Sequence, residues 1–231
     1  MKKKSKDNWF EKDIFILERE EGRLQLRKTD DPQLGPVYVD FLAATLEYRR
    51  KFGGGRSEAI AKAVGIKKGV TLNVVDVTAG LGRDAFILAS LGCRVHMIER
   101  VEMIAALLED GLERAAEDPQ IGEWVRKRLS LSHQDSIKSF KTLPFVPDVI
   151  YLDPMFPPKT KSALSKKEME VFKLLVGPDE DADELLDVAL GHAKNRVVVK
   201  RPSHAGFLAD RKPDTSIKTP KHRFDVYFPS K

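Results

Sequence analysis

From residue 71 onward, short apolar runs alternate with stretches of helical length and pattern. The runs that predict strands are residues 72–77, 94–99, 129–133, 148–152, 196–200 and 224–228. The stretches that predict helices lie near residues 83–91, 101–117, 163–175 and 182–193. Such alternation is typical of an α/β fold whose mostly parallel sheet carries helices on both faces. Residues 202–220 show no helical pattern, so we expect the last strand to run antiparallel to its neighbour.

The first 70 residues lack this alternation. Two short apolar runs flank Glu20-Glu21-Gly22 and predict a hairpin. Helical spacing predicts one helix over residues 38–50 and a second over residues 57–64, with Ser57 as the N-cap of the second. We therefore expect a small α+β extension over residues 1–70, followed by an α/β domain over residues 71–231.

Composition narrows the classes of protein to which the chain can belong. Its 231 residues are 42% hydrophobic, which is enough for one core, and 40 Lys and Arg against 35 Asp and Glu give a net charge of +5. That excess permits an anionic partner without requiring one. Cys93 is the single cysteine, so no internal disulfide can form. The histidines show no metal spacing and no run of 18 apolar residues occurs, so we expect no metal, no membrane span and a cytoplasmic location.

A glycine-rich turn follows the first strand of the α/β pattern and opens a helix. Gly80 and Gly82 allow a tight turn and let the backbone approach a ligand closely. The free N–H groups at a helix start favour an anion such as a carboxylate. Arg83 suits a carboxylate and Asp84 suits an ammonium, and the methionine part of S-adenosylmethionine (SAM) carries both. The turn therefore predicts a SAM site.

Polar residues at the ends of the next two strands extend this prediction. Glu99 lies 19 residues after Gly80 and could accept hydrogen bonds from both ribose hydroxyls, while Arg100 could cover one face of an adenine. Asp135 could accept from the adenine amino group, and the Ser136 N–H could donate to the ring. The turn also fits the G-x-G-x-x-A fingerprint of nicotinamide and flavin proteins, so that alternative stays open on these residues.

The tetrapeptide Asp153-Pro154-Met155-Phe156 follows the fourth strand and favours methyl transfer. An exocyclic amine on a base is a poor nucleophile, because its lone pair is conjugated into the ring. The Asp153 carboxylate could accept one N–H, the Pro154 carbonyl could accept the other, and Phe156 could stack on the base. Asp-Pro alone is a common turn signal, so an ordinary turn is the competing interpretation.

Basic residues near these motifs are candidate RNA contacts. Arg49, Arg50, Lys51 and Arg56 surround the glycines at residues 53–55, and Lys200 ends the fifth strand. Such cations can contact phosphates, and Phe52 could stack on a base. In a chain that is 32% charged, each cluster could also be an ordinary solvated surface.

Four segments together resemble the ribosomal RNA small subunit methyltransferase J family: residues 48–56, 76–84, 151–157 and 197–202. The likeness extends from about residue 24 to residue 228. It implies a class I SAM-dependent methyltransferase fold with an N-terminal extension, and N2-methylation of a guanine near the 3′ end of 16S rRNA in the 30S subunit. It also implies that the SAM contacts are Arg83, Asp84, Glu99, Arg100, Asp135, Ser136 and Asp153.

The residues by themselves reach only a SAM donor and a planar amine acceptor, whereas rRNA and guanine N2 rest on the resemblance. A DNA base or a protein amide also presents a planar amine. From other classes, a nicotinamide-dependent oxidoreductase and a non-catalytic RNA-binding assembly factor remain open on the sequence.

Overall fold

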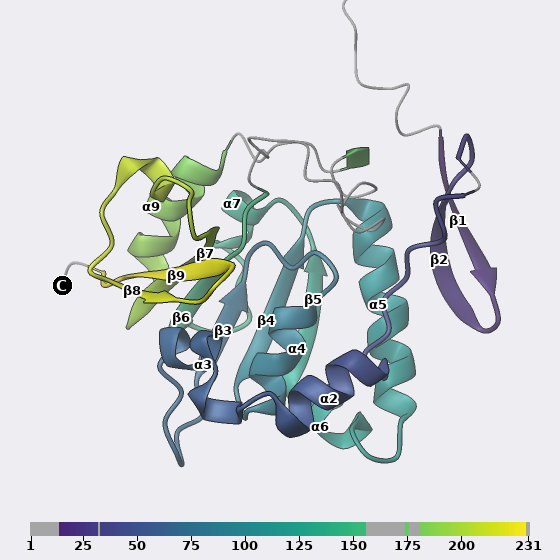
Figure 1. The fold of residues 1–231 in the computed structure, drawn as a ribbon, viewed down its shortest axis with the longest axis horizontal. Coiled ribbons are helices and arrows are strands. Elements are labelled where there is room, and N and C mark those ends of the chain that lie inside the picture. Colours follow the sequence, from purple (N-terminus) through teal and green to yellow (C-terminus); the bar gives the residue numbers. More distant parts are fainter. Residues whose placement is uncertain (1–13, 32, 156–173, 176–180, 230–231) are drawn as a thin grey trace, which may run out of the picture.

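A computed structural model describes residues 14–31, 33–155, 174–175 and 181–229 of the chain. Most of the helix expected near residues 163–175, and Phe156, lie outside these ranges. Within them, a central sheet carries helices on both faces, and a separate two-stranded hairpin lies at one side (Figure 1). No helix in these ranges is long and apolar enough to cross a lipid bilayer.

The central sheet has seven strands in the order β5-β4-β3-β6-β7-β9-β8. Their bounds are Asn73–Asp76 (β3), Arg94–Glu99 (β4), Leu129–His133 (β5), Val149–Leu152 (β6), Arg196–Pro202 (β7), Thr215–Lys218 (β8) and His222–Tyr227 (β9). β5, β4, β3, β6 and β7 pair in parallel, and β9 pairs antiparallel with both β7 and β8. The expected α/β class and antiparallel last strand are therefore confirmed.

β8 was not expected from the sequence. It is a four-residue strand at the edge of the sheet, and none of its side chains is buried. An edge strand of this kind carries little hydrophobic signal, because only its backbone is needed to pair with β9.

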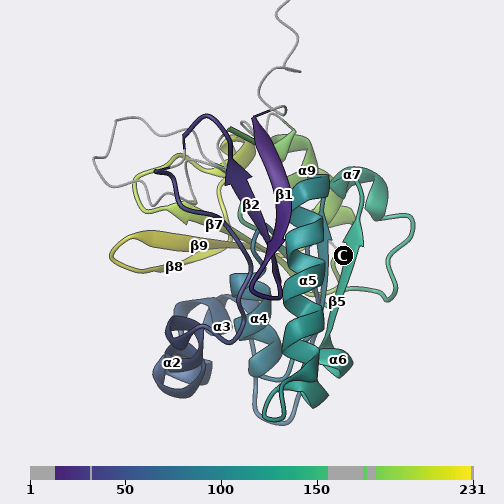
Figure 2. The same cartoon turned by 90° about the vertical axis from the view of Figure 1, so that its right-hand side faces the viewer.

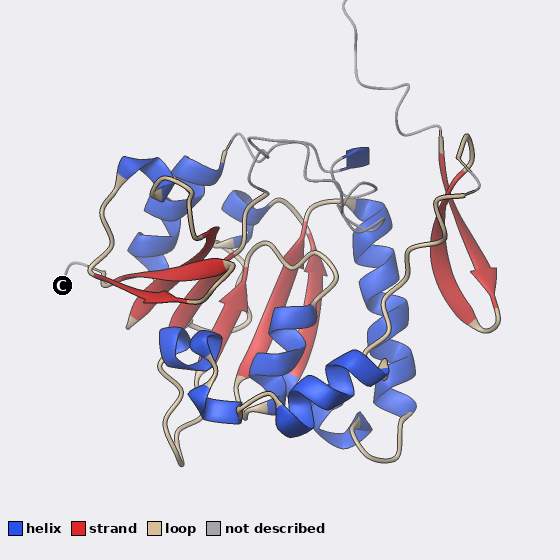
Figure 3. Ribbon diagram, in the orientation of Figure 1, coloured by secondary structure: helices blue, strands red, loops and turns tan. Residues whose placement is uncertain are grey.

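Alternate residues of the central strands pack into two cores on the two faces of the sheet. Val74 and Val149 belong to the first core, whereas their neighbours Val75 and Ile150 belong to the second. This separation follows from the period of two residues along a strand. The flanking helices are drawn in blue in Figure 3, and their bounds are Arg83–Ser90 (α4), Glu102–Glu117 (α5), Gly122–Arg128 (α6), Ser136–Ser139 (α7) and Ala182–His192 (α9).

The predicted N-terminal hairpin is confirmed. β1 (Phe15–Glu20) pairs antiparallel with β2 (Arg23–Lys28), and Glu21 and Gly22 form the turn with φ of 51° and 78°. Two consecutive residues with positive φ match the right-handed twist of the strands. The hairpin lies beside α5 (Figure 2), where Arg19 Nη1 contacts the buried Asp110 Oδ1 at 2.8 Å.

The helix expected over residues 38–50 begins later, as α2 (Ala44–Phe52). The Asp40 carboxylate accepts the Leu42 N–H at 2.9 Å, which makes a turn before the helix. Phe41 precedes α2, and its buried ring stacks on Phe86 of α4 with centroids 4.9 Å apart. The described part of residues 1–70 therefore contributes to the core of the central sheet.

The prediction that Ser57 caps the second helix was wrong. α3 (Ala59–Val64) begins after Glu58, and Ser57 belongs to a short 3-10 turn, η1 (Gly55–Ser57). The Ser57 hydroxyl donates to the Gly54 carbonyl at 2.6 Å. The side chain is therefore used to close the glycine loop.

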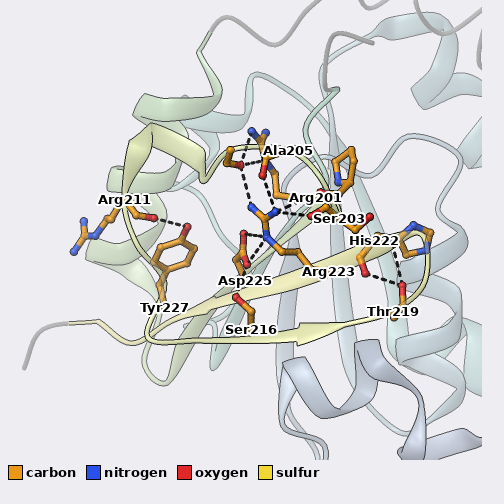
Figure 4. Close-up of polar contacts among 12 residues, drawn as sticks. Arg201, Ser203, Ala205, Arg211, Ser216, Thr219, His222, Arg223, Asp225 and Tyr227 are labelled. Carbon is orange, nitrogen blue, oxygen red and sulfur yellow. Dashed lines mark hydrogen bonds and ion pairs between the residues drawn. The ribbon is translucent and has the colours of Figure 1, made fainter. Parts of the chain in front are cut away.

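A buried ion pair holds the C-terminal strands to the loop that follows β7 (Figure 4). Arg223 Nε lies 2.9 Å from both carboxylate oxygens of Asp225, and neither side chain has more than 7% of its surface exposed. The Arg223 guanidinium also donates to the carbonyls of Ala205 at 2.6 Å and Gly206 at 3.0 Å. This network fixes β9 against β7, and β7 carries Lys200.

Candidate active site

Three strands of the central sheet bring polar side chains together at their carboxyl ends. Asp153 follows β6, Lys200 lies in β7, and Thr78 follows β3. The Asp153 N–H donates to Thr78 Oγ1 at 2.6 Å, and Lys200 Nζ lies 2.8 Å from Asp153 Oδ2. Because the carboxyl ends of parallel strands meet at one edge, residues distant in the sequence form one site.

Asp84, in the first turn of α4, lies at the centre of this site. Its carboxylate accepts from Lys200 Nζ at 2.8 Å, from the Tyr151 hydroxyl at 2.8 Å, and from Arg49 Nη1 at 3.1 Å. Burial disfavours the charge, but Lys200 and the other donors outweigh it and lower the pKa of Asp84 to about 2. Asp84 is therefore a fixed anion.

Lys200 bridges the two carboxylates. Its burial works against the charged form, yet the attraction of Asp153 and Asp84 raises its pKa above the ordinary value. Partial burial raises the pKa of Asp153, the Lys200 ammonium lowers it, and the Asp84 carboxylate raises it. The side chain of Asp153 is 41% exposed, against 15% for Asp84, so Asp153 is the carboxylate that a ligand can reach.

Tyr151 and Thr78 were not predicted as site residues from the sequence. A signal for Tyr151 was available, because residues two apart in a strand point to the same face, and Tyr151 lies two residues before Asp153. Thr78 lies in the glycine turn, but its contact with Asp153 joins residues 75 apart in the chain. No local pattern indicates such a contact.

The glycine turn lies against Glu99. The Gly80 N–H donates to Glu99 Oε2 at 2.9 Å, and the Val101 N–H donates to Oε1 at 2.8 Å. Burial raises the pKa of Glu99, and these N–H groups oppose the rise. Gly80 and Gly82 have φ of 54° and 68°, the left-handed region that favours glycine.

The remaining predicted cofactor residues lie at the same edge of the sheet. Asp135 caps α7 by accepting the Lys138 N–H at 3.0 Å, and the Ser136 hydroxyl donates to the Val77 carbonyl at 2.6 Å. Arg100 Nη1 lies 2.9 and 3.0 Å from the two carboxylate oxygens of Asp181. The hydrogen bond between Ser136 and Val77 joins the segment after β5 to the segment after β3, where the glycine turn begins.

These groups match the chemistry of SAM. The start of α4 offers N–H groups for a carboxylate, and Asp84 and Glu99 are acceptors for an ammonium and for hydroxyls. A carboxylate has about four acceptor positions, and Asp84 uses three of them, which leaves room for about one more donor. In the described ranges, no group of three or more His, Cys, Asp or Glu side chains could hold a metal ion.

The predicted RNA contacts fall into two groups. Arg49 donates to Glu58 Oε2 at 2.9 Å as well as to Asp84, and Lys200 is only 22% exposed. Both side chains therefore pair with carboxylates of the protein, and their contact with RNA stays a prediction. Arg50 is half-buried, Lys51 pairs with Glu47, and Arg56 is exposed, so these three cations lie at the surface.

Asp76 predicts a pH dependence of stability. Its carboxyl is 2% exposed and accepts the Thr78 N–H at 3.1 Å. Burial raises the pKa to about 8 from the ordinary 3.8, against the lowering by Thr78. The folded protein therefore keeps a proton that the unfolded chain releases, so the stabilisation is present at low pH and is lost as pH rises through about 8.

We expect the free energy of unfolding to fall with pH between 5 and 8, by up to about 1.4 kcal/mol per pH unit from this group. An Asp76→Asn variant lacks this proton and should not show that part of the slope. Urea denaturation of both proteins at pH 5, 6, 7 and 8 measures the difference. If the free energies of unfolding of the two proteins changed with pH by the same amount, a raised pKa for Asp76 would be contradicted.

Comparison with known proteins is consistent with this geometry. A family model of SAM-dependent methyltransferases matches residues 3–229. Ribosomal RNA small subunit methyltransferase J of Aeromonas hydrophila is 61% identical over 92% of this chain and 86% of its own length. The protein of that name from Photobacterium profundum is 58% identical over 94% of this chain and 87% of its own length. A solved SAM-dependent methyltransferase from Neisseria gonorrhoeae is 38% identical, with a TM-score of 0.73 over 92% of this chain and 82% of that one.

Proposed function

The chain belongs to the ribosomal RNA small subunit methyltransferase J family of SAM-dependent methyltransferases, and we propose that it methylates N2 of a guanine near the 3′ end of 16S rRNA. Membership of this family excludes the nicotinamide-dependent alternative. We further propose that its partner is the 30S subunit and that it works in the cytoplasm. SAM supplies the electrophilic methyl group, and the residues proposed to hold SAM are Gly80, Gly82, Arg83, Asp84, Glu99, Arg100, Asp135, Ser136 and Asp153.

The arrangement of Asp153 carries the proposal. Its backbone N–H is held by Thr78 and its carboxylate by Lys200, at the edge of the sheet where the glycine turn begins. This fixed and partly exposed carboxylate is suited to accept one N–H of an exocyclic amine. Pro154, which is buried, follows directly and carries the carbonyl proposed to accept the other N–H.

Accepting both N–H groups prepares the nitrogen for reaction. Electron density rises on the nitrogen, and its lone pair is directed away from the plane of the base. The methyl group leaves the sulfur of SAM as the nitrogen receives it, the nitrogen must lose one proton, and the Asp153 carboxylate is proposed to accept that proton. Positioning of this kind contributes several kcal/mol to a rate enhancement. Phe156, outside the described residues, remains our proposal for stacking on the base.

Lys200 is proposed to position Asp153. A Lys200→Met variant should lower kcat about 10²-fold, because Asp153 and Asp84 both lose a cation partner, although Asp84 keeps Tyr151 and Arg49. Without the ammonium, the pKa of Asp153 rises, so the acidic limb of the kcat/KM profile should move to higher pH. Rates measured on 30S subunits between pH 5 and 9 test both effects.

Two variants serve as references for Lys200. Lys200→Arg keeps the charge and should recover part of the rate. Lys127 is a cation on α6 whose side chain is 70% exposed. Because α6 lies at the other end of the strands from the candidate site (Figure 1), Lys127→Met should not change the pH profile of kcat/KM. An unshifted acidic limb in Lys200→Met would show that Lys200 does not act through Asp153.

The function is tested by methyl transfer from radiolabelled SAM to 30S subunits from a strain that lacks the gene. Nuclease digestion and mass spectrometry then identify the labelled nucleoside and its place in the rRNA. N2-methylguanosine at one site near the 3′ end is the expected product. Label in another nucleoside, or none in RNA while SAM still binds, would reject the guanine N2 assignment and lead to DNA and protein acceptors.

A further inference from the structure

Two aromatic side chains of α2 lie open to solvent. Tyr48 is 67% exposed and Phe52 is 69% exposed, which are the largest exposed fractions among the big apolar side chains of the described residues. They are four residues apart on one helix, so they share a face, and their ring centroids are 5.2 Å apart. Aromatic rings with this much exposed surface contribute little to the hydrophobic core. Their exposure on α2 indicates that they bind another molecule.

Other side chains of α2 hold the helix against the rest of the protein. Leu46 is buried, and Arg49 contacts both Asp84 and Glu58. Arg49 follows Tyr48 directly in the chain. The two rings are therefore held on an anchored helix, and Arg49, which contacts Asp84, lies one residue from Tyr48 and three from Phe52.

Three cations lie close to the two rings in the chain. Arg50 and Lys51 lie in the last turn of α2, and Arg56 follows in η1. The nearest carboxylates in the chain are Glu47, which pairs with Lys51, and Glu58, which pairs with Arg49. Aromatic rings interleaved with cations are typical of surfaces that bind single-stranded nucleic acid, since bases stack on the rings and phosphates contact the cations. A protein partner would not require this density of positive charge around the rings.

We propose that Tyr48 and Phe52 form a stacking surface for unpaired bases of the rRNA that flank the target nucleotide, with Arg50, Lys51 and Arg56 contacting the adjoining phosphates. This inference rests on the proposed function for the identity of the RNA. Sequence-specific enzymes act on RNA bases that are unstacked, and a nucleotide next to a flipped base needs a new stacking partner. The surface could supply that partner, and Arg49, which follows Tyr48 in the chain and contacts Asp84, connects it to the candidate site.

The first test is RNA binding by the full chain without turnover. The probe is a fluorescently labelled single-stranded RNA of mixed sequence, measured by anisotropy against the same RNA as a duplex. Tyr48→Ala and Phe52→Ala should each weaken single-strand binding about tenfold, and the double variant more. Ring-keeping variants, Tyr48→Phe and Phe52→Tyr, should bind like the parent protein. Unchanged binding in the double alanine variant would overturn the proposal.

Controls separate stacking from charge and from folding. Val146→Ala removes another apolar side chain that is 57% exposed, in the loop before β6, and should leave RNA binding unchanged. Lys51→Gln should reduce the salt dependence of binding by about one counterion, whereas the alanine variants at the rings should keep the parent salt slope. Equal SAM affinity by calorimetry and equal Tm verify that the ring variants are folded.

A second measurement distinguishes this inference from the proposed function. With 30S subunits, the double alanine variant should raise KM at least tenfold and leave kcat unchanged. Ring-dependent binding of single strands by a protein that fails to methylate 30S subunits would keep the surface and reject the function. Loss of 30S methylation with unchanged binding of naked RNA would indicate a ribosomal protein as the partner of the rings, which overturns the inference.

Discussion

Replacing Asp153 with alanine is expected to abolish methyl transfer while the protein stays folded. The variant removes the carboxylate that we propose accepts the amine N–H and its proton, so kcat should fall by a factor of about 10³ or more. The side chain is 41% exposed, and the backbone N–H that Thr78 accepts is unchanged. Little stability should therefore be lost. Lys200 also keeps Asp84 as a partner, at 2.8 Å.

Single-turnover methylation of 30S subunits measures the effect, with thermal unfolding and SAM binding recorded on the same preparation. Asp153→Asn is the matched variant, since it keeps the shape and one acceptor oxygen but cannot take up a proton. It should fall between the parent protein and the alanine variant. Methylation at the parent rate by Asp153→Ala, in a folded protein, would remove Asp153 from the mechanism.

Replacing Asp225 with alanine is expected to destabilise the protein by about 3–5 kcal/mol, because it leaves the buried Arg223 guanidinium without its counter-charge. The Ser216 hydroxyl, which donates to Asp225 Oδ1 at 2.6 Å, would also lose its acceptor. The loss of stability should also affect β7, because β7 pairs antiparallel with β9. Urea denaturation at pH 7 measures the change in the free energy of unfolding.

The ion pair between Arg211 and Asp187 provides the comparison. Its side chains are 47% and 70% exposed and lie 3.3 Å apart, so Asp187→Ala should change stability by about 0.5 kcal/mol or less. A double variant, Arg223→Met with Asp225→Leu, removes both charges and should recover most of the stability lost in Asp225→Ala. Equal, small effects of Asp225→Ala and Asp187→Ala would show that burial does not govern the Arg223–Asp225 pair.

Several elements follow directly from hydrophobic periodicity. β4 and β5 have the bounds that the sequence predicts, and α5 and α9 differ from their predicted bounds by one residue at most. These elements are long or strongly patterned. The buried apolar residues of α9 all belong to one core, whereas those of β4 alternate between the two cores on the faces of the sheet. Short elements such as β8, α6 and α7 were not predicted, because few of their buried residues are apolar and they carry little hydrophobic pattern.

The start of α2 shows a different limit. Residues 38–43 have apolar groups at helical spacing, yet Val39 and Phe41 are buried from a non-helical segment. Tertiary packing on α4 and α5 provides the apolar partners, so the periodicity has a cause other than a helix. The contact of Phe41 with Phe86 joins residues 45 positions apart, and no local pattern indicates it.

The sequence by itself determined the fold class, the order of the strands along the chain and the motifs at their ends. These depend on local periodicity, on the conformational freedom of glycine and on the rule that parallel strands end at one edge. The tertiary structure decided which charges pair. Lys200 meets Asp153 and Asp84 across 47 and 116 residues, and Arg49 meets Asp84 across 35. The strength of a charge pair depends on the distance between its atoms and on their burial, and the folded chain alone sets both.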